Sequence, residues 1–369
     1  MPMSAVAPQH YPALLASKVD TVSGIMAPFS PPAPQVYPSP PTDFRLRAEF
    51  RMWHEGDTIN YVMYRREDPR TPVVITEFPI ADQCIQAAMP LLHTVVNAND
   101  TLRRKLFQVE FLAGLSGELL VTLIYHRKLD DEWEAAAQTL ISELLPVAPA
   151  LSIIGRSRKQ KRVIGRDYIQ EILPLSTREF HYRQYEQAFS QPNGRVNIQM
   201  IEWACDKARA LAGDLLELYC GNGNFTLPLS EHFGHVIATE LSKVSIRAAR
   251  ANLADNAISN VHLLRMSAEE VTQAMNAERI FRRVSELPKP LEQFELNTLF
   301  VDPPRAGLDE HTAAMASRFQ TIIYISCNPQ SLAENMRALD ATHRIEHFAM
   351  FDQFPYTDHM ECGVILKRK

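Results

Sequence analysis

The pattern of apolar and polar positions changes along the chain and predicts three parts. Residues 12–26 repeat apolar side chains at helical spacing behind Pro12, which predicts a short amphipathic helix. A proline-rich stretch follows over 28–41. Because proline cannot donate to a sheet, we expect an extended connector that pairs with no strand. Residues 1–40 are therefore predicted to form an N-terminal helix and a proline-rich connector.

The second part, 41–180, is rich in segments with strand-like alternation. Strands are expected at 44–53, 58–64, 72–78, 107–112 and 119–125, and helices near 82–96 and 131–145. Gly114 and Gly117 separate the last two strands and indicate a hairpin. We therefore expect an α+β domain centred on an antiparallel sheet.

In the third part, 181–369, short apolar strands alternate with helices from about residue 205. Strands are expected at 215–219, 236–239, 261–265, 298–301 and 322–325, with helices near 224–233, 242–256, 268–277, 309–318 and 329–339. This alternation predicts an α/β fold with a doubly wound, mostly parallel, Rossmann-like sheet. Residues 344–351 and 363–369 have no helix between them, which predicts a C-terminal antiparallel hairpin.

The amino-acid composition excludes some classes of protein but does not identify a function. The 369 residues are 46% hydrophobic and 22% charged, which excludes a mostly disordered chain. The net charge of −5 does not by itself indicate a nucleic-acid partner, and binding to nucleic acid would need local basic patches. The N-terminus lacks the pattern of a signal peptide, and no apolar run reaches the roughly 20 residues of a membrane span. We therefore expect a cytoplasmic protein without a membrane partner.

The five cysteines are scattered and form no CxxC pair. This spacing is typical of reduced thiols and gives no reason to expect a zinc ribbon or an iron–sulfur cluster. We therefore expect neither a metal nor a cluster.

The first candidate site is a glycine loop between a strand and a helix. The predicted strand 215–219 runs into Cys220-Gly-Asn-Gly-Asn-Phe225, where glycines let the backbone approach a ligand closely. Thr226 stands where a dinucleotide-binding loop has its third glycine, which disfavours a dehydrogenase. A cofactor without phosphates, such as S-adenosylmethionine, does not need that glycine. For the loop alone, a purely structural turn remains the alternative.

An acidic residue strengthens the nucleoside interpretation. Glu240 ends the next predicted strand, 21 residues after Tyr219. A carboxylate at this point of a βαβ unit can accept hydrogen bonds from ribose hydroxyls. Together, the loop and the acid predict a nucleoside-containing cofactor.

The second candidate site is a cysteine at another strand end. Cys327 follows the strand 322–325, and Asn328 and Pro329 suit the cap and first position of a helix. A helix N-terminus favours the thiolate, so we expect a nucleophilic Cys327. Asp302 ends the preceding strand, and such ends meet at one edge of a sheet. A small core residue is the alternative interpretation of this cysteine.

A base is expected in the polar and aromatic segment 351–363. If this segment is held over the carboxyl edge of the sheet, Glu361 would face the thiol. Asp358 and His359 are competing candidates on the sequence alone. A surface loop without chemistry is the remaining alternative.

Several motifs in order give the chain a family resemblance. They are QPNGRVNIQM, DLLELYCGNGNF, ATE, FVDPPRAGLD, YISCNPQSL and DQFPYTDHMECG. The chain resembles the RNA uracil-5-methyltransferase family over nearly its whole length, and within it the bacterial tRNA branch. The resemblance implies S-adenosylmethionine-dependent methylation of uracil C5 in the T-loop of tRNA, at position 54 in tRNA numbering, and in the T-arm-like loop of tmRNA.

The resemblance also implies roles for individual residues. Cys327 would be the nucleophile that adds to uracil C6, and Glu361 the proton acceptor. The residues that would contact S-adenosylmethionine are Gln191, Tyr219, Gly221, Asn224, Glu240 and Asp302. The cysteine cluster with which related ribosomal-RNA enzymes hold an iron–sulfur centre is absent, which favours the tRNA branch.

Basic and aromatic positions are candidates for RNA contacts. The basic ones are Arg45, Arg47, Arg51, the run 103–105, and the run that starts with Arg156, Arg158 and Lys159 and continues to Lys161, Arg162 and Arg166. Phe107 or Tyr125 could stack on a base, and His126 belongs to the same set. Arg305 is a candidate donor to the C4 oxygen of uracil, with a structural ion pair as its alternative. For the basic residues the alternative is a solvated charged face, and for the aromatic residues it is a position in the core.

Two other functions are compatible with parts of the sequence. DNA cytosine-5 methylation uses the same thiol logic, but its signature cysteine follows a proline, whereas Ser326 precedes Cys327 here. A tRNA-binding or folding module, with methylation secondary, is the other alternative. We expect the tRNA T-arm as the partner, and no DNA and no obligate partner protein.

Overall fold

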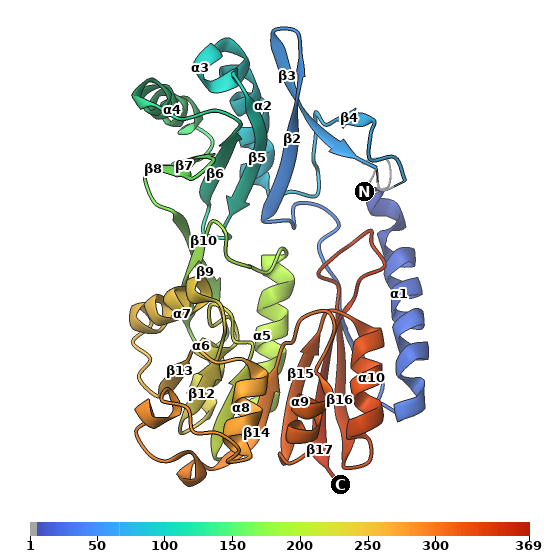
Figure 1. Cartoon of the computed structure of the whole chain (residues 1–369). Coiled ribbons are helices and arrows are strands. Elements are labelled where there is room, and N and C mark those ends of the chain that lie inside the picture. The colour runs from blue at the N-terminus through green and yellow to red at the C-terminus, as the bar shows by residue number, and fades with distance from the viewer. Residues whose placement is uncertain (1–5, 66) are drawn as a thin grey trace. The chain divides into compact units, whose positions relative to one another are not determined.

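The computed structural model describes residues 6–65 and 67–369 (Figure 1). The chain divides into two compact units. The first contains 6–9, Pro40–Leu173 and Arg183–Gly194, and the second contains His10–Ser39, Pro174–Tyr182 and Arg195–Lys369. Residues 10–39 thus belong to the second unit, together with the C-terminal half of the chain.

The first unit is built on a seven-stranded sheet in the order β4-β3-β2-β5-β6-β7-β8. Its strands are β2 (Arg47–Glu55), β3 (Thr58–Tyr64), β4 (Pro72–Val74), β5 (Leu106–Ala113), β6 (Glu118–Tyr125), β7 (Ala150–Ser157) and β8 (Gln160–Ile164). Its helices are α2 (Gln83–Ala98), α3 (Asp100–Arg103) and α4 (Asp131–Leu144). The predicted antiparallel sheet is confirmed except for β6 and β7, which run parallel because α4 crosses between them.

The second unit holds an eight-stranded sheet in the order β1-β16-β17-β15-β14-β11-β12-β13. Its strands are β1 (Gln35–Tyr37), β11 (Asp214–Leu218), β12 (Val236–Thr239), β13 (Val261–Leu264), β14 (Leu296–Val301), β15 (Thr321–Ser326), β16 (His343–Phe351) and β17 (Glu361–Arg368). Neighbouring strands pair parallel except at β17, which is antiparallel to both β15 and β16. The predicted mostly parallel α/β sheet with a C-terminal hairpin is confirmed.

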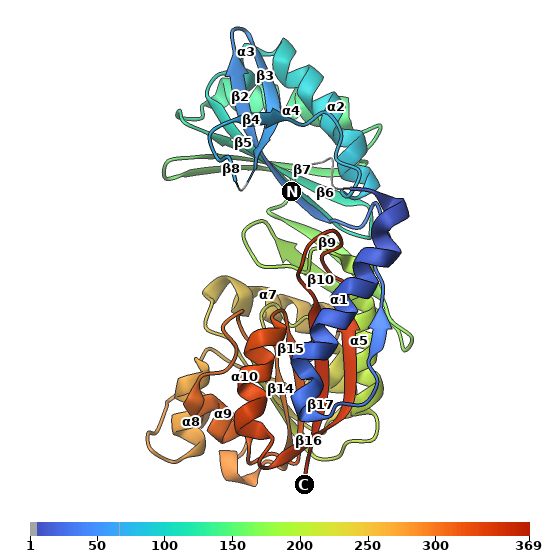
Figure 2. The same ribbon diagram turned by 90° about the vertical axis from the view of Figure 1, so that its right-hand side faces the viewer.

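Helices cover both faces of this sheet. They are α1 (Tyr11–Met26), α5 (Gly194–Ala208), α6 (Thr226–Leu229), α7 (Lys243–Asp255), α8 (Ala268–Met275), α9 (Glu310–Ala316) and α10 (Pro329–Leu339). Residues of α1, α8, α9 and α10 share one apolar core with Cys362 and Val364 of β17. Gly363 faces the other way, since a Cβ there would lie 2.8 Å from the Trp203 ring of α5. Figure 2 accordingly shows α5 across these strands from α10.

The prediction that the proline-rich stretch pairs with no strand was wrong. Gln35, Val36 and Tyr37 form β1, which pairs parallel with Ala349–Phe351 of β16. These three residues are the non-proline positions between Pro34 and Pro38, so they keep the N–H groups that pairing needs. As a strand at the edge of the sheet, β1 tolerates prolines on both sides.

Other boundaries also differ from the prediction. The strand expected at 72–78 ends at Val74, and the helix expected at 224–233 is a short α6 followed by a 3-10 turn at Ser230–His232. The sequence pattern did not predict β7, β8, α5 or a two-stranded sheet of β9 (Tyr168–Pro174) and β10 (Glu179–Tyr185). In β8, the adjacent charged residues Lys161 and Arg162 interrupt the alternation of polar and apolar positions.

Candidate functional site

The predicted residues of the second unit gather at one edge of its sheet. The strands β11, β12, β14 and β15 run parallel, so their carboxyl ends meet there. The residues that directly follow these strands are Tyr219, Glu240 after Thr239, Asp302 and Cys327. Four strand ends thus bring the predicted cofactor and catalytic residues to a common edge.

The glycine loop after β11 depends on left-handed backbone. Tyr219, Gly221 and Gly223 have φ angles of 62°, 57° and 91°. The N–H of Gly223 donates to the carbonyl of Cys220 at 2.9 Å, and a Cβ on Gly223 would lie 2.5 Å from Leu227. Gly223 is therefore required by conformation and by space. A left-handed tyrosine is an uncommon, strained residue of the kind found at ligand sites.

Glu240 joins the loops that follow β11 and β12. Its Oε2 accepts a hydrogen bond from the N–H of Gly221 at 3.1 Å, and its Oε1 accepts one from the N–H of Ser242 at 2.6 Å. The carboxylate therefore has a fixed orientation beside the glycine loop. Each oxygen retains a lone pair for a further donor, such as a ribose hydroxyl.

Asn224 and Gln191, two predicted cofactor contacts, lie in different units of the structure. The side-chain amides of Asn224 and Asn197 exchange two hydrogen bonds of 2.9 Å, and the Tyr182 hydroxyl donates to the Asn224 carbonyl at 3.0 Å. Asn224 is thus held from α5. Gln191 lies in the segment before α5, is partly exposed, and belongs to the first unit.

Glu217 is a buried acid, in the strand before the glycine loop, that the sequence pattern did not single out. It is fully buried in β11, and neither carboxyl oxygen has a hydrogen-bond partner among the described residues. Burial, and then the charge of Asp302, raise the pKa of Glu217 to about 8. The signal was present in the sequence, because an acidic residue inside the apolar strand DLLEL is costly unless a ligand uses it.

Cys327 and Glu361 are neighbours through strand register. Ser326, the last residue of β15, pairs with Cys362 of β17, and Phe351 of β16 pairs with Glu361. In an antiparallel pair, the next positions, 327 and 361, then stand opposite each other about 5 Å apart. The two strands therefore bring a thiol and a buried carboxyl together.

The surroundings of Cys327 do not all favour the thiolate. Burial, and then the charges of Glu361 and Asp302, raise the pKa of the Cys327 thiol to about 11, while Arg305 acts in the opposite direction. Cys327 precedes the cap of α10, Asn328, whose side chain accepts from the N–H of Gln330 at 3.2 Å. Cys327 does lie beside a helix N-terminus, as expected, whereas burial and two carboxyl groups favour the protonated thiol.

The three candidate bases differ in how far they are exposed to solvent. Glu361 is 4% exposed, whereas Asp358 and His359 are exposed on the loop. Burial, and then the charge of Asp302, raise the pKa of Glu361 to about 8. Burial also raises the pKa of Asp302 to about 7. Glu361 is therefore the one of the three whose surroundings suit proton transfer near neutral pH.

The loop after β14 is fixed to α10. The Asn328 side chain donates to the Arg305 carbonyl at 3.0 Å, and the Asn335 side chain both donates to the Leu308 carbonyl and accepts from its N–H. The guanidinium of Arg305 is exposed at this edge. The backbone that carries Asp302 and Arg305 is thus held beside Cys327.

Three of the predicted RNA-contact residues form one stack in the first unit. The Arg51 guanidinium lies 4.0 Å from the centre of the Phe107 ring, and the Phe107 and His126 rings stack with centres 4.0 Å apart. A hollow of about 560 Å³ lies beside them, lined by Arg51, Met52, Trp53, His54, Tyr64 and Phe107. Partly exposed planar groups next to a hollow can receive an unstacked base.

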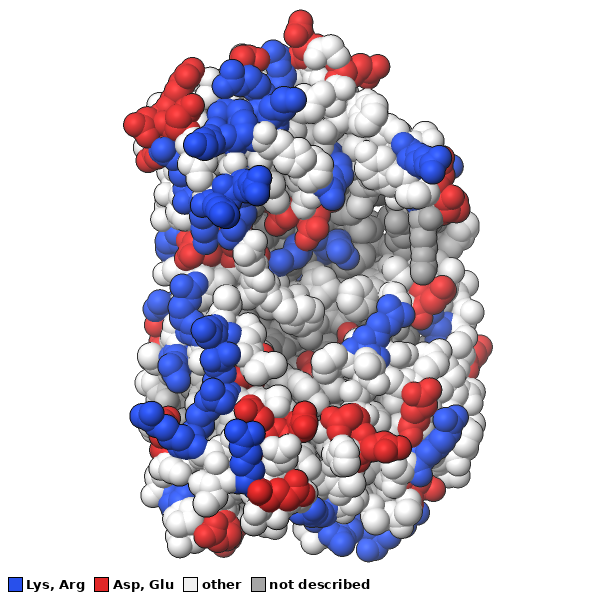
Figure 3. Space-filling model, viewed as in Figure 1, with Lys and Arg blue, Asp and Glu red and all other residues white. Residues whose placement is uncertain are grey.

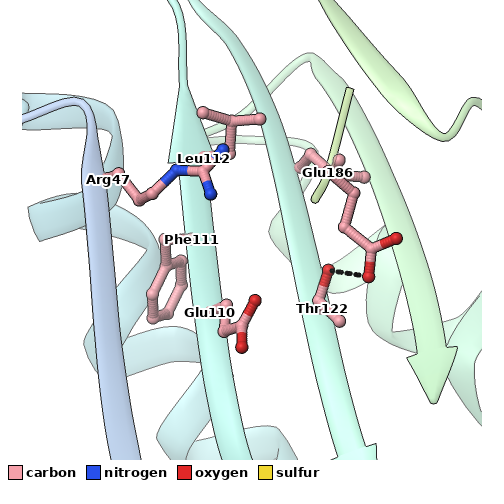
Figure 4. A pocket seen from close by; sticks show the side chains of 7 residues that line it. Arg47, Glu110, Phe111, Leu112, Thr122 and Glu186 are labelled. Atoms are coloured by element: carbon pink, nitrogen blue, oxygen red, sulfur yellow. Dashed lines mark hydrogen bonds between the residues drawn. The ribbon is translucent and has the colours of Figure 1, made fainter. Parts of the chain in front are cut away.

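Arg156, in contrast, has a structural partner. Its guanidinium makes two hydrogen bonds to the buried carboxylate of Glu186, which also accepts from the Thr122 hydroxyl at 3.3 Å. Figure 4 shows Glu186 and Thr122 facing a small hollow shared with Arg47 and Glu110. Arg156 therefore balances a buried charge, and its side chain is only 24% exposed.

Most of the remaining basic candidates are also engaged. Lys161 pairs with Asp167 and Glu186, Arg162 with Asp131 and Glu134, and Arg166 with Glu118, while Arg103 pairs with Asp100. Arg47 donates to the Ala188 carbonyl and Arg45 to the Arg47 carbonyl.

Arg158 and Lys159 are exposed in the β7–β8 turn, and no ion pair joins them to an acid within the described part of the chain. Figure 3 shows Lys and Arg gathered on this face, over the region of α3, β5 and β7 in Figure 1.

Tyr125 was wrongly proposed as a stacking residue. Its ring is 2% exposed, and its hydroxyl donates to the Leu102 carbonyl at 2.9 Å. Strand spacing alone does not distinguish this inward position from the partly exposed Phe107.

The described residues contain neither a candidate membrane-spanning helix nor a candidate metal site. Within 6–65 and 67–369, no helix is both long and apolar enough to cross a membrane. In the same ranges, no group of three or more His, Cys, Asp or Glu side chains could hold a metal ion.

Comparisons with known proteins agree with this fold and edge. The family model for tRNA (Uracil-5-)-methyltransferase matches residues 10–369. Two relatives carry the name tRNA/tmRNA (uracil-C(5))-methyltransferase. The one from Aromatoleum aromaticum is 52% identical over 369 residues, which are 100% of this chain and 98% of the relative. The one from Vibrio parahaemolyticus is 49% identical over 364 residues, which are 99% of this chain and 98% of the relative.

A solved structure shares the fold. The tRNA (uracil-54, C5)-methyltransferase of Pyrococcus abyssi, crystallised with S-adenosyl-L-homocysteine, superposes with a TM-score of 0.73 at 20% identity. The match covers 98% of this chain and 85% of that one. With the family model matched over nearly its full length, the chain belongs to the tRNA (uracil-5-)-methyltransferase family.

Proposed function

We propose that this protein transfers a methyl group from S-adenosylmethionine to C5 of the uridine at position 54 in the T-loop of tRNA. The T-arm-like loop of tmRNA is a further substrate, and the cytoplasm is the compartment. One observation carries the proposal: the register of β15 and β17 sets the Cys327 thiol beside the Glu361 carboxyl. Full-length relatives at 52% and 49% identity bear the corresponding name, which supports the choice of RNA.

The edge of the sheet fits S-adenosylmethionine. Glu240 would accept from the ribose hydroxyls, and Leu241, 57% exposed directly after it, offers an apolar surface to the adenine. The buried carboxyl of Glu217 and the partly buried carboxyl of Asp302 suit the positive charges of the sulfonium and the ammonium. The other proposed contacts are Gln191, Tyr219, Gly221 and Asn224. When bound, the cofactor supplies a methyl group on a positively charged sulfur.

Cys327 and Glu361 would act on the base in turn. Uracil C5 is a weak nucleophile, so the Cys327 sulfur adds to C6, and the electron pair of the C5–C6 double bond moves toward C5 and the C4 oxygen. C5 then takes the methyl group. Glu361 removes the C5 proton, the double bond re-forms, and the C6–S bond breaks to release the thiolate. The exposed guanidinium of Arg305 is the proposed donor to the C4 oxygen.

The raised pKa of Cys327 has a role in this scheme. The thiol must lose its proton before it adds, and the charges of Glu361 and Asp302 oppose that loss. A cation bound beside these carboxyls offsets them and lowers the pKa of the thiol. The nucleophile would therefore form after the cofactor binds, which keeps a reactive thiolate from being present in its absence.

The RNA must also present its base. A stacked uridine has to be turned out at a cost of a few kcal/mol. We propose that the Arg51, Phe107 and His126 stack receives a second unstacked base, and that Arg158 and Lys159 contact phosphates. These contacts would offset the cost of unstacking.

The test is incubation of the protein with unmodified tRNA and S-adenosylmethionine labelled in the methyl group, followed by nucleoside analysis. The expected product is labelled 5-methyluridine, which disappears when uridine 54 is replaced by cytidine. Label at another nucleoside, or an equal yield from the cytidine variant, would contradict the proposal.

A further inference from the structure

The loop that leads to Glu361 is held by a residue with a buried charge. This loop, 352–360, joins β16 to β17, and Glu361 is the first residue after it. Asp352, its first residue, is fully buried, and its N–H donates to the Tyr37 carbonyl of β1 at 3.0 Å. A carboxylate buried at this position needs partners, and they come from the other end of the chain.

Both partners of Asp352 lie on α1. The Lys18 ammonium forms an ion pair with Asp352 Oδ1, and the Tyr11 hydroxyl donates to Oδ2 at 2.9 Å. Lys18 also donates to the Phe354 carbonyl at 3.2 Å, so it holds two points of the loop. The Tyr11 oxygen in turn accepts from the N–H of Ser39 at 2.8 Å. Every residue named in this network is part of the second unit.

The helix α1 combines apolar packing with polar contacts to the loop. Its buried side chains are Tyr11, Lys18, Val22 and Met26. Val22 and Met26 join the apolar core that contains residues of α10, and α1 lies along α10 in Figures 1 and 2. Leu15 and Val19 also pack against this core, so apolar contacts flank Lys18 on α1, while Tyr11 and Lys18 reach the loop. A helix needed only for packing would bury apolar side chains along the whole stripe.

We propose that Lys18 and Tyr11 are positioning residues for the base. By holding Asp352 and the Phe354 carbonyl, they keep the 352–360 loop in the conformation that sets Glu361 against Cys327. This inference rests on the proposed function for the identity of the base, but the effect on the loop does not. Loss of either contact acts mainly on proton removal from C5, which follows methyl transfer.

The test compares Lys18→Met with Val22→Ala, a matched loss on the same helix that leaves Asp352 paired. In Lys18→Met, turnover on unmodified tRNA should fall by about ten- to a hundredfold, the range that small misplacements of a reacting group produce. A covalent protein–RNA complex carrying the new methyl group should accumulate, while cofactor affinity stays within about twofold of the wild type, because the cofactor residues lie on other loops. Lys18→Arg should restore most of the turnover, since it keeps the charge.

Hydrogen exchange of the 352–360 loop gives a readout independent of catalysis. It should speed up in Lys18→Met and much less in Val22→Ala. Equal exchange and equal turnover losses in these two variants would overturn the proposal, as would turnover of a folded Lys18→Met within twofold of the wild type. If Lys18→Met does not fold, Tyr11→Phe, which removes one oxygen, must show the same loop exchange and adduct, or the proposal fails. A wild type that forms no 5-methyluridine would refute the proposed function instead, and the exchange comparison would still decide whether α1 holds the loop.

Discussion

Ser326 pairs with Cys362 across β15 and β17, and this single pairing determines that the next residues, Cys327 and Glu361, face each other. The two groups come from strands of opposite direction. Had β17 joined the sheet parallel to β15, its first residue would lie at the opposite edge from Cys327. The antiparallel strand in an otherwise parallel sheet is therefore the feature that assembles the thiol and the carboxyl.

Glu361→Gln should trap the reaction after methyl transfer. The amide cannot take the C5 proton, so the methylated ring should remain bonded to Cys327, with turnover slowed by about two to four orders of magnitude. Mass spectrometry of the protein–RNA complex on unmodified tRNA checks that the adduct carries the extra methyl group.

Asp358→Asn is the matched control for that substitution, because Asp358 is exposed on the same loop. It should turn over normally and trap nothing. If Asp358→Asn traps the adduct and Glu361→Gln does not, the assignment of the base is wrong.

Cys327→Ala should abolish methylation and leave cofactor affinity nearly unchanged. Without the sulfur, C5 stays a weak nucleophile, while the glycine loop and Glu240 are untouched. Labelled product formation and calorimetry with S-adenosylmethionine measure the two properties. Replacement of the buried Cys205, which lies on α5, is the control and should keep the activity. Appreciable turnover of Cys327→Ala would exclude the covalent route.

Glu240→Ala should weaken S-adenosylmethionine binding by about 1.5–3 kcal/mol, the usual contribution of hydrogen bonds to a charged group. The Gly221 and Ser242 N–H groups would also lose their acceptor, which loosens the loop. Calorimetry gives the affinity, and tRNA binding should change little. An unchanged cofactor affinity would leave Glu240 only a structural role.

The protein without cofactor should lose stability as the pH rises from about 5 to 8. Burial raises the pKa of Glu217 and Glu361 to about 8 and of Asp302 to about 7, so between their unfolded and folded pKa values the folded state binds more protons than the unfolded state. Each such group then lowers the free energy of unfolding by up to about 1.4 kcal/mol per pH unit. Thermal unfolding across this range, with and without S-adenosylmethionine, measures the slope.

Glu217→Gln is the control for this dependence. It removes one of the three titrating groups and should make the slope shallower, and bound S-adenosylmethionine should do so too, because a cation stabilises the ionised carboxyls. A flat profile in the wild type would mean that these carboxyls are already ionised in the folded state throughout the range.

Charge reversal at Arg158 and Lys159 should weaken tRNA binding and flatten its dependence on salt. Each lost phosphate contact lowers the log–log slope by about 0.7–0.9. Reversal at Arg162, which pairs with Asp131 and Glu134, is the comparison and should change the slope less. If Arg162 has the larger effect, the exposed turn is only a solvated surface.

The sequence predicted the strand–helix alternation of the second unit well, because buried parallel strands such as 236–239 and 322–325 are short apolar runs. It also predicted which strand ends carry Glu240, Asp302 and Cys327. It could not predict which basic residues are exposed, since the partner of Arg156 is Glu186, 30 residues away. The carboxyl groups around the Cys327 thiol could not be predicted for the same reason, because they come from other strand ends.

The contact between Tyr11 and Asp352 spans 341 positions of the chain, which has a consequence for biosynthesis. Residues 10–39 leave the ribosome long before β16 and the 352–360 loop, to which they bind. During translation α1 and β1 therefore lack these partners, and such long-range pairing is slow to form. A nascent chain would remain catalytically inactive until β16 and β17 are released, so methylation by chains that lack this hairpin is prevented by the topology itself.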